Sequence, residues 1–117
     1  MTEETISLGR IEVAPEVIAT IARLVVSANE TVTKMGNPPS GRLFSRAIKQ
    51  EGVVLHYENS KLIFDIYVFM DPRGNIRQAS RTLQGAIIEA MDQMVGIPVE
   101  AVNIHVEDVT YQPDQAA

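Results

Sequence analysis

The apolar run from Lys61 to Met70 predicts the central strand of a sheet, because a long stretch rich in β-branched and aromatic residues is typical of a strand covered on both faces. Successive side chains of a strand point to opposite faces. One face therefore carries only apolar residues: Leu62, Phe64, Ile66, Val68 and Met70. The other carries Ile63, Asp65, Tyr67 and Phe69, and its carboxylate and phenol predict contact with a partner.

A first helix is predicted from Pro15 to about Glu30, because proline fits the first helical position and Glu16 complements the positive end of the helix dipole. The expected core stripe comprises Val17, Ile21, Leu24 and Ala28, widened by Ile18 and Val25. The opposite side carries Ala19, Ala22 and Val26 and has few polar residues. We expect this side to contact a neighbour, with Ala19 and Val26 in an interaction surface.

A second helix is predicted from Ile76, after Asn75 as its N-cap and with Gln78 three residues later. Gly96 and Pro98 are typical of its end. The expected core face is Ile76, Ala79, Leu83, Ala86, Ile87, Ala90, Met91 and Met94.

Three further strands are predicted from alternation of apolar and polar residues, at residues 6–13, 52–58 and 102–107. A hairpin through Asn59-Ser60-Lys61 joins the second of them to the central strand. Between the first helix and this hairpin, Met35–Gly41 is rich in glycine and proline and predicts a loop, and residues 41–50 predict a short helix.

This order, β-α-(loop or short helix)-β-β-α-β, predicts a two-layer α+β domain with a mixed sheet of about four strands and two long helices on one face. The central strand and the last strand should lie parallel. The helix-free face should show Val54, His56, Ile63, Tyr67, Phe69 and His105. We expect a disordered N-terminus at residues 1–5, a single domain at 6–109 and a polar tail at 110–117.

Charge is unevenly distributed along the chain of 117 residues, whose net charge is −5. Residues 31–82 carry eight Lys or Arg against four acids, whereas both ends are acidic. This pattern predicts either association between copies or one basic patch for an anion, alongside the alternative of a solvated surface. The candidate patch for an anion or RNA is Arg42, Arg46, Arg73, Arg77 and Arg81. It lacks interleaved aromatic residues, and the acidic total disfavours nucleic acid.

No catalytic, cofactor-binding or metal motif is apparent. The chain has no cysteine, which excludes disulfides and thiolate metal sites. His56 and His105 with Asp65 lack the short spacing of a specific zinc motif, and we interpret the histidines as surface or interface residues. Asp65 is a candidate catalytic carboxylate or, more simply, a charge that prevents wrong strand pairing. No apolar leader or spanning segment is evident, which predicts a cytoplasmic chain without direct membrane insertion.

Four segments together resemble the bacterial alkaline shock protein family, also called the envelope stress response family. They are residues 11–22, residues 62–68, Gly74-Asn-Ile76 with Gln84, and residues 96–106. The resemblance covers most of residues 6–109. It implies a small, non-enzymatic, cytoplasmic α+β domain that self-associates and lies at the inner side of the cell envelope through a membrane-anchored partner. It implies no cofactor. Pro38-Pro39 and the short tail depart from the family pattern.

The expected function is therefore a structural or interaction protein of the stress response, with Ala19, Val26, Ile63, Tyr67 and Phe69 as its contact surface. The alternative is a small RNA- or anion-binding module that uses the basic middle of the chain.

Overall fold

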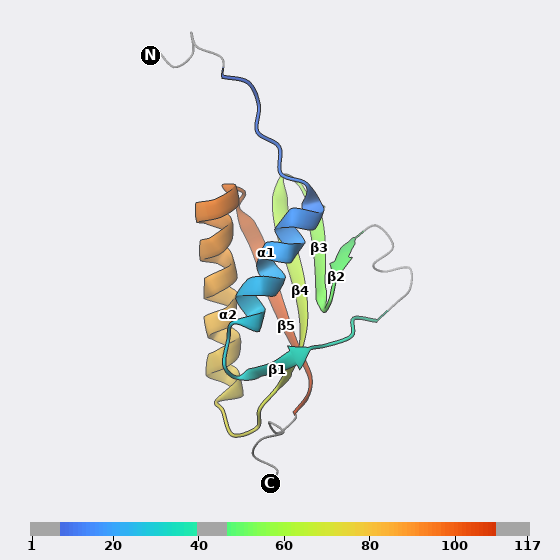
Figure 1. Cartoon of the computed structure of the whole chain (residues 1–117), viewed down its shortest axis with the longest axis vertical. Helices are drawn as coiled ribbons and strands as arrows, with labels where there is room; N and C mark the ends of the chain where they lie inside the picture. Colours follow the sequence, from blue (N-terminus) through green and yellow to red (C-terminus); the bar gives the residue numbers. More distant parts are fainter. Residues whose placement is uncertain (1–7, 40–46, 110–117) are drawn as a thin grey trace.

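The computed structural model describes residues 8–39 and 47–109, which form a five-stranded sheet and two long helices (Figure 1). The helices are α1 (Pro15–Ser27) and α2 (Ile76–Ala90), and α2 continues into a π-helical turn, η3 (Met91–Val95). The strands are β1 (Val32–Met35), β2 (Ile48–Gln50), β3 (Val53–Glu58), β4 (Lys61–Met70) and β5 (Val99–Val109). The α+β class is confirmed.

Strand β4 is the centre of the sheet, as its apolar run predicts. β5 pairs with β4 in parallel from Leu62 to Met70, which confirms the predicted parallel neighbours. On the other edge, β3 pairs antiparallel with residues 61–66 of β4, and β1 pairs antiparallel with residues 68–70. β2 extends the sheet beyond β3.

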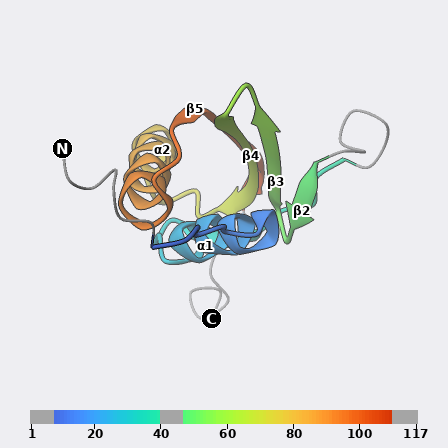
Figure 2. The ribbon, with the colours of Figure 1, turned by 90° about the horizontal axis from the view of Figure 1, so that it is seen from above.

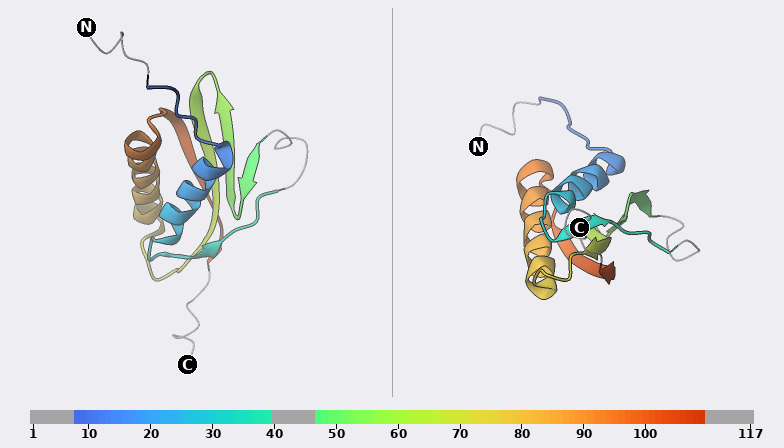
Figure 3. Two further views of the ribbon diagram at one scale, coloured as in Figure 1. Left: turned by 45° about the horizontal axis from the view of Figure 1, so that its top comes forward. Right: turned by 60° about the horizontal axis from the view of Figure 1, so that its bottom comes forward.

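Both long helices cover the same face of the sheet (Figure 2). Two further views show α1 and α2 side by side in front of the strands (Figure 3). Between the layers lies the core, and the predicted apolar face of β4 is its floor: Leu62, Phe64, Ile66, Val68 and Met70 are all buried. Helix α2 adds Ala79, Leu83 and Ile87, and η3 adds Met91. All four belong to the predicted core face of the second helix, whereas Met94 of that face is 65% exposed.

The predicted core stripe of α1 is wrong in part: Ile18 is buried, and Ile21 and Val25 pack against the core, but other members of the stripe do not. Val17 and Leu24, expected in the core, are 49% and 56% exposed, whereas Ala19 and Val26, expected on an interaction surface, are fully buried. The cause is that apolar residues occupy most of this helix, so their spacing cannot tell which side faces the sheet. A stripe along Val17 and Leu24 is therefore left on the outside of the molecule.

Three strand predictions are corrected. Of the strand predicted at residues 6–13, residues 6 and 7 lie outside the described residues. Residues 8–13 form no strand, because nothing pairs with them in the described chain, and Leu8 and Ile11 are almost fully exposed. Ile48–Gln50 is strand β2 rather than part of a helix, and residues 41–46 of that predicted helix lie outside the described residues. β1 was not expected, and the sheet therefore has five strands rather than about four.

Two tight turns fix the register of the antiparallel strands. Glu51 and Gly52 link β2 to β3, and Asn59 and Ser60 link β3 to β4; all four have positive φ, which is the pattern of type I′ hairpin turns. The second hairpin is the predicted one. The first was missed, although its Glu-Gly pair is a recognisable turn signal.

The helical segment formed by α2 and η3 begins and ends where the sequence predicts. The Asn75 side-chain oxygen accepts a hydrogen bond from the Gln78 backbone N–H at 2.9 Å, which satisfies a free donor of the first turn. The helical backbone ends at Gly96, whose φ of 78° suits the one residue without a side chain.

Candidate functional site

The helix-free face of the sheet carries a hydrogen-bonded cluster centred on Asp65 of β4. His105 of β5 lies with its Nε2 atom 2.8 Å from Oδ1 of Asp65, and His56 of β3 places its Nε2 atom 3.3 Å from Oδ2. Asn103 of β5 donates from Nδ2 to Oδ1 at 3.2 Å. We call these four residues the Asp65 cluster. Side chains of three adjacent strands therefore converge on one carboxylate.

Tyr67 completes this face beside the Asp65 cluster. Its ring stacks on the His105 imidazole, with centroids 4.3 Å apart and planes 9° apart. Burial raises the pKa of the Tyr67 hydroxyl, and the nearby Asp65 and Glu107 carboxylates raise this pKa further. The phenol is thus held in its neutral form.

Glu107 ties β5 to the chain that follows β1. Its Oε1 atom accepts a hydrogen bond from the Asn37 backbone N–H at 2.6 Å. The backbone beneath is tightly packed, because Gly36 donates to the Tyr67 carbonyl and Tyr67 donates to the Gly52 carbonyl. A side chain at Gly36 would collide with Glu107 and with the Tyr67 backbone. These contacts fix the sheet where β1 and β3 meet along β4.

The structure divides the five residues of the predicted interaction surface. Ile63 and Phe69 lie partly buried on the helix-free face, and Lys34 places its ammonium group 4.7 Å from the Phe69 ring centre. Tyr67 is on this face but only 7% exposed. Ala19 and Val26 lie in the core on the other side of the sheet, which removes them from any such surface.

The Asp65 cluster was only partly predictable. The sequence placed His56, Asp65 and His105 on strands, yet their convergence depends on the register of β3 and β5 against β4. Within the described residues, no group of three or more His, Cys, Asp or Glu side chains is arranged to hold a metal ion. Asp65 instead accepts from neighbouring donors, which suits a structural carboxylate.

The candidate basic patch is dispersed. Arg73 pairs with Asp71 through its backbone and its guanidinium, and the side-chain hydrogen bond holds the pKa of Asp71 below its usual value. Arg77 and Arg81 line a hollow of about 390 Å³ with Asn75 and Gln78 at the start of α2. Arg42 and Arg46 lie outside the described residues.

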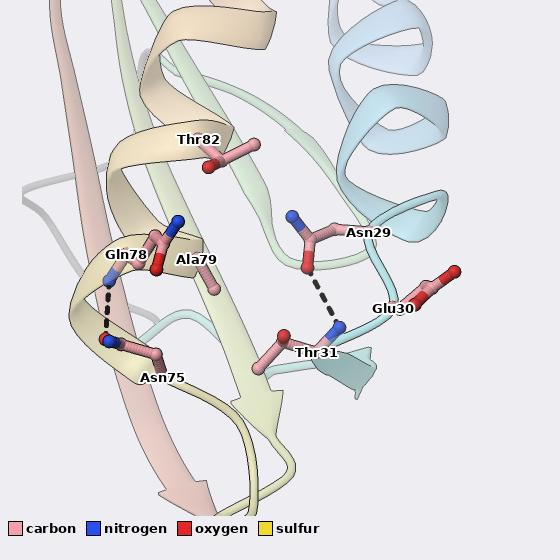
Figure 4. Close-up of a pocket in the computed structure, with 7 residues that line it drawn as sticks. All are labelled: Asn29, Glu30, Thr31, Asn75, Gln78, Ala79 and Thr82. Atoms are coloured by element: carbon pink, nitrogen blue, oxygen red, sulfur yellow. Dashed lines mark hydrogen bonds between the residues drawn. The ribbon is translucent and has the colours of Figure 1, made fainter.

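A second hollow of about 360 Å³ separates the end of α1 from the start of α2 (Figure 4). It is lined mostly by uncharged polar side chains, including Asn29, Thr31, Gln78 and Thr82, with Glu30 at its edge. The Asn29 side chain accepts from the Thr31 backbone N–H at 2.9 Å, which shapes the bend between α1 and β1. These contacts explain the hollow as a helix junction.

An apolar pocket of about 430 Å³ opens at the end of the molecule where the β3–β4 hairpin turns. Its floor consists of core residues, including Ile18, Leu55 and Leu62. Ile11 and Tyr57 stand at its mouth and are 94% and 61% exposed. We call it the hairpin-end pocket.

Comparison with known families decides the affiliation of the chain. Residues 3–111 match the model of a family, alkaline shock protein 23, described as having a cell envelope-related function. The chain belongs to this family. The resemblance noted from the sequence is thereby confirmed, and a cell envelope-related function follows from membership.

Two relatives of the alkaline shock protein 23 type support the assignment without adding an activity. The chain is 31% identical to the uncharacterized protein Spy1535 of Streptococcus pyogenes serotype M6, covering 97% of this chain and 91% of that protein. It is 26% identical to the uncharacterized protein YqhY of Bacillus subtilis, covering 95% and 84%.

A solved structure titled "MamM CTD H264E - Zinc form 2" also aligns with the chain. The TM-score is 0.48 at 10% identity, over 86% of this chain and 88% of that one.

Across residues 8–39 and 47–109, none of the helices has the length and apolar character needed to cross a membrane.

Proposed function

We propose that this chain is a non-enzymatic interaction protein of cell-envelope stress homeostasis, which associates with its own copies and binds a membrane-anchored partner from the cytoplasmic side. The observation that carries the proposal is the helix-free face of the sheet. Both helices lie on the opposite face (Figure 2), so β3, β4 and β5 present a broad surface to the outside. We propose this face as the surface of self-association.

The composition of this face suits burial against another copy. Ile63 and Phe69 are apolar and only partly buried, and Val54 of β3 is already fully buried. Asp65 accepts hydrogen bonds from its own neighbours. Covering a carboxylate that keeps its donors costs less free energy than covering one that loses water without replacement.

The same contacts favour a structural role for Asp65 over a catalytic one. A general base needs a free acceptor directed at a substrate proton. The Asp65 carboxylate instead accepts hydrogen bonds from two side chains of β5 and contacts His56 of β3, and its side chain is 15% exposed. We therefore infer that the Asp65 carboxylate holds β3, β4 and β5 together.

Light scattering tests self-association and its surface together. We expect the wild-type mass to rise with protein concentration and the Ile63→Lys variant to remain monomeric. Leu24→Lys is the matched control, because it places the same charge on an exposed apolar position of α1. A monomeric wild type at high concentration would refute self-association. Loss of association in Leu24→Lys alone would transfer the interface to α1.

Binding to a membrane-anchored partner is tested by co-sedimentation with native inner membranes. We expect the chain to sediment with untreated membranes and to stay in solution when protease has removed exposed membrane proteins. Vesicles made from the extracted lipids are the control and should not bind it. Equal binding to these protein-free vesicles would contradict a protein partner.

A second candidate function rests on the hollow that Arg77 and Arg81 share at the start of α2. Two guanidinium groups one helical turn apart, beside amide side chains, suit contact with a phosphate group. Binding of a short RNA that weakens steeply with salt and is lost in Arg77→Glu would favour this function. Absence of binding at low salt would exclude it.

A further inference from the structure

We propose that the hairpin-end pocket receives a partner segment in which an apolar side chain is flanked by Lys or Arg. The inference deepens the proposed partner binding and rests on it, but it concerns a surface separate from the self-association face. Four parts of the chain meet at the pocket: the segment before α1, the first turn of α1, the β3–β4 hairpin and Ile97 after η3. Figure 1 shows these parts together at one end of the molecule.

The floor of the pocket is formed by residues at the edge of the core. Leu55 and Leu62 are 2% and 1% exposed and form part of its floor, so an inserted side chain would touch core residues directly. Its volume of about 430 Å³ lies within the range of sites that enclose a small ligand or a few side chains. Ile11 and Tyr57 at the mouth add exposed apolar surface that an occupant would cover. The site therefore favours an apolar anchor.

The charges around the pocket determine which residues are favoured on either side of the apolar anchor. Glu12 lines the pocket itself and pairs with Arg10 at 3.6 Å. Among the described residues, the turns and element ends at this end of the molecule carry further acids, among them Glu16, Glu58, Asp92 and Glu100, and two cations, Arg10 and Lys61. With Glu12, these five carboxylates and two cations sum to −3. This charge attracts a basic segment and repels the anionic surface of a lipid bilayer.

An NMR titration of the full chain with designed peptides tests the pocket. The probe is the octapeptide Lys-Lys-Gly-Leu-Phe-Gly-Lys-Lys, and the controls replace Leu-Phe by Ser-Ser or all four Lys by Glu. We expect shifts of the amides around Val13, Leu55, Leu62 and Ile97 with the probe and at least a tenfold weaker effect with either control.

Two variants locate the contact without disturbing the core. Tyr57→Ser changes an exposed residue at the mouth without adding charge and should weaken the probe about tenfold, because the anchor loses apolar contact. Glu12→Lys should weaken the probe and strengthen the Glu-flanked control. Leu24→Ser on α1 is the matched control and should bind the probe like the wild type.

Four results would overturn the proposal. Two concern the peptides: equal binding of the Ser-Ser peptide, or amide shifts centred on the helix-free face. The third is amide shifts at the pocket caused by anionic phosphatidylglycerol vesicles in place of the peptide. The fourth is amide shifts at the pocket caused by raising the protein concentration alone. The last would identify a second copy as the occupant. An unoccupied pocket in a chain that still self-associates would remove this inference alone, whereas a chain that neither self-associates nor binds membranes would remove the proposed function.

Discussion

Replacing Asp65 by alanine should destabilise the fold, because the carboxylate joins three strands. Its oxygens contact His105 at 2.8 Å, Asn103 at 3.2 Å and His56 at 3.3 Å. A hydrogen bond contributes about 0.5–1.5 kcal/mol to stability, which gives about 2 kcal/mol for the two bonds from His105 and Asn103, and the His56 contact adds a smaller share. The His105 side chain is 42% exposed and can exchange its lost bond for water. We therefore expect a loss of about 2 kcal/mol for Asp65→Ala.

Urea denaturation measures this loss. The chain has no tryptophan, so far-UV circular dichroism is the suitable signal, at one fixed protein concentration because self-association would add to the apparent stability. A loss of about 2 kcal/mol corresponds to a decrease in Tm of about 8 °C for a domain of this size. The matched control is Glu58→Ala, which removes an exposed carboxylate at the end of β3 and should cost less than about 0.5 kcal/mol.

The alternative role of Asp65, protection against wrong strand pairing, predicts a different result. A charge with only that role could be removed without loss of stability, and the variant would aggregate instead. Equal midpoints for Asp65→Ala and Glu58→Ala would therefore refute the stabilising role of the Asp65 cluster. The stabilising role would be supported if the double variant Asp65→Ala/His105→Ala loses less stability than the sum of the two single variants, because residues in direct contact show a coupling energy in a double-mutant cycle.

Three further predictions follow from single contacts. Gly52→Ala should lower the free energy of unfolding by about 1–3 kcal/mol in urea denaturation, because Gly52 has a φ of 84° and a new Cβ would lie 2.8 Å from the Tyr67 carbonyl oxygen. The control Gly85→Ala, in α2 with open space around it, should raise this free energy by up to about 1 kcal/mol. Equal effects of the two variants would contradict this reasoning. The raised pKa of Tyr67 should make stability fall as pH rises above about 10, where the unfolded phenol ionises first, and Tyr67→Phe should flatten this fall. The pKa of Asp71 is lower in the folded chain than its unfolded value of 3.8, so this carboxylate stabilises the fold at pH values above 3.8, and the stabilisation is lost as the pH falls below that value. In an acid titration, the Arg73→Met variant should therefore lose less stability than the wild type.

Local signals in the sequence were sufficient for the central strand, the second hairpin and α2. Asn75 and Gly96 mark the ends of the last helix by chemistry that acts within one turn, and Asn59-Ser60 suits a two-residue hairpin. Each feature depends on residues close together in the chain.

Non-local contacts explain what could not be predicted. β1 and β2 are four and three residues long, and they exist as strands because β4 and β3 pair with them. The stretch before α1 alternates in the same way but has no strand beside it in the described chain. The inward face of α1 is decided by the sheet it covers, since its sequence is apolar on several sides.

The candidate site shows the same limit. The sequence predicted that Ile63, Tyr67 and Phe69 share one face of β4. It did not predict that the His105 imidazole stacks on the Tyr67 ring. Nor did it predict the Asp65 cluster, whose members are up to 49 positions apart. Such contacts require the register of three strands at once.

Site-directed cross-linking tests the central claim, association through the helix-free face, most directly. The chain has no native cysteine, so Ile63→Cys introduces a single thiol on that face, and Leu24→Cys introduces one on α1 as the control. With a short bifunctional maleimide, we expect the Ile63→Cys chain to be captured as a covalent dimer at concentrations where the wild type associates, and the Leu24→Cys chain to remain monomeric. A dimer captured only through Leu24→Cys, or through neither thiol, would contradict the claim.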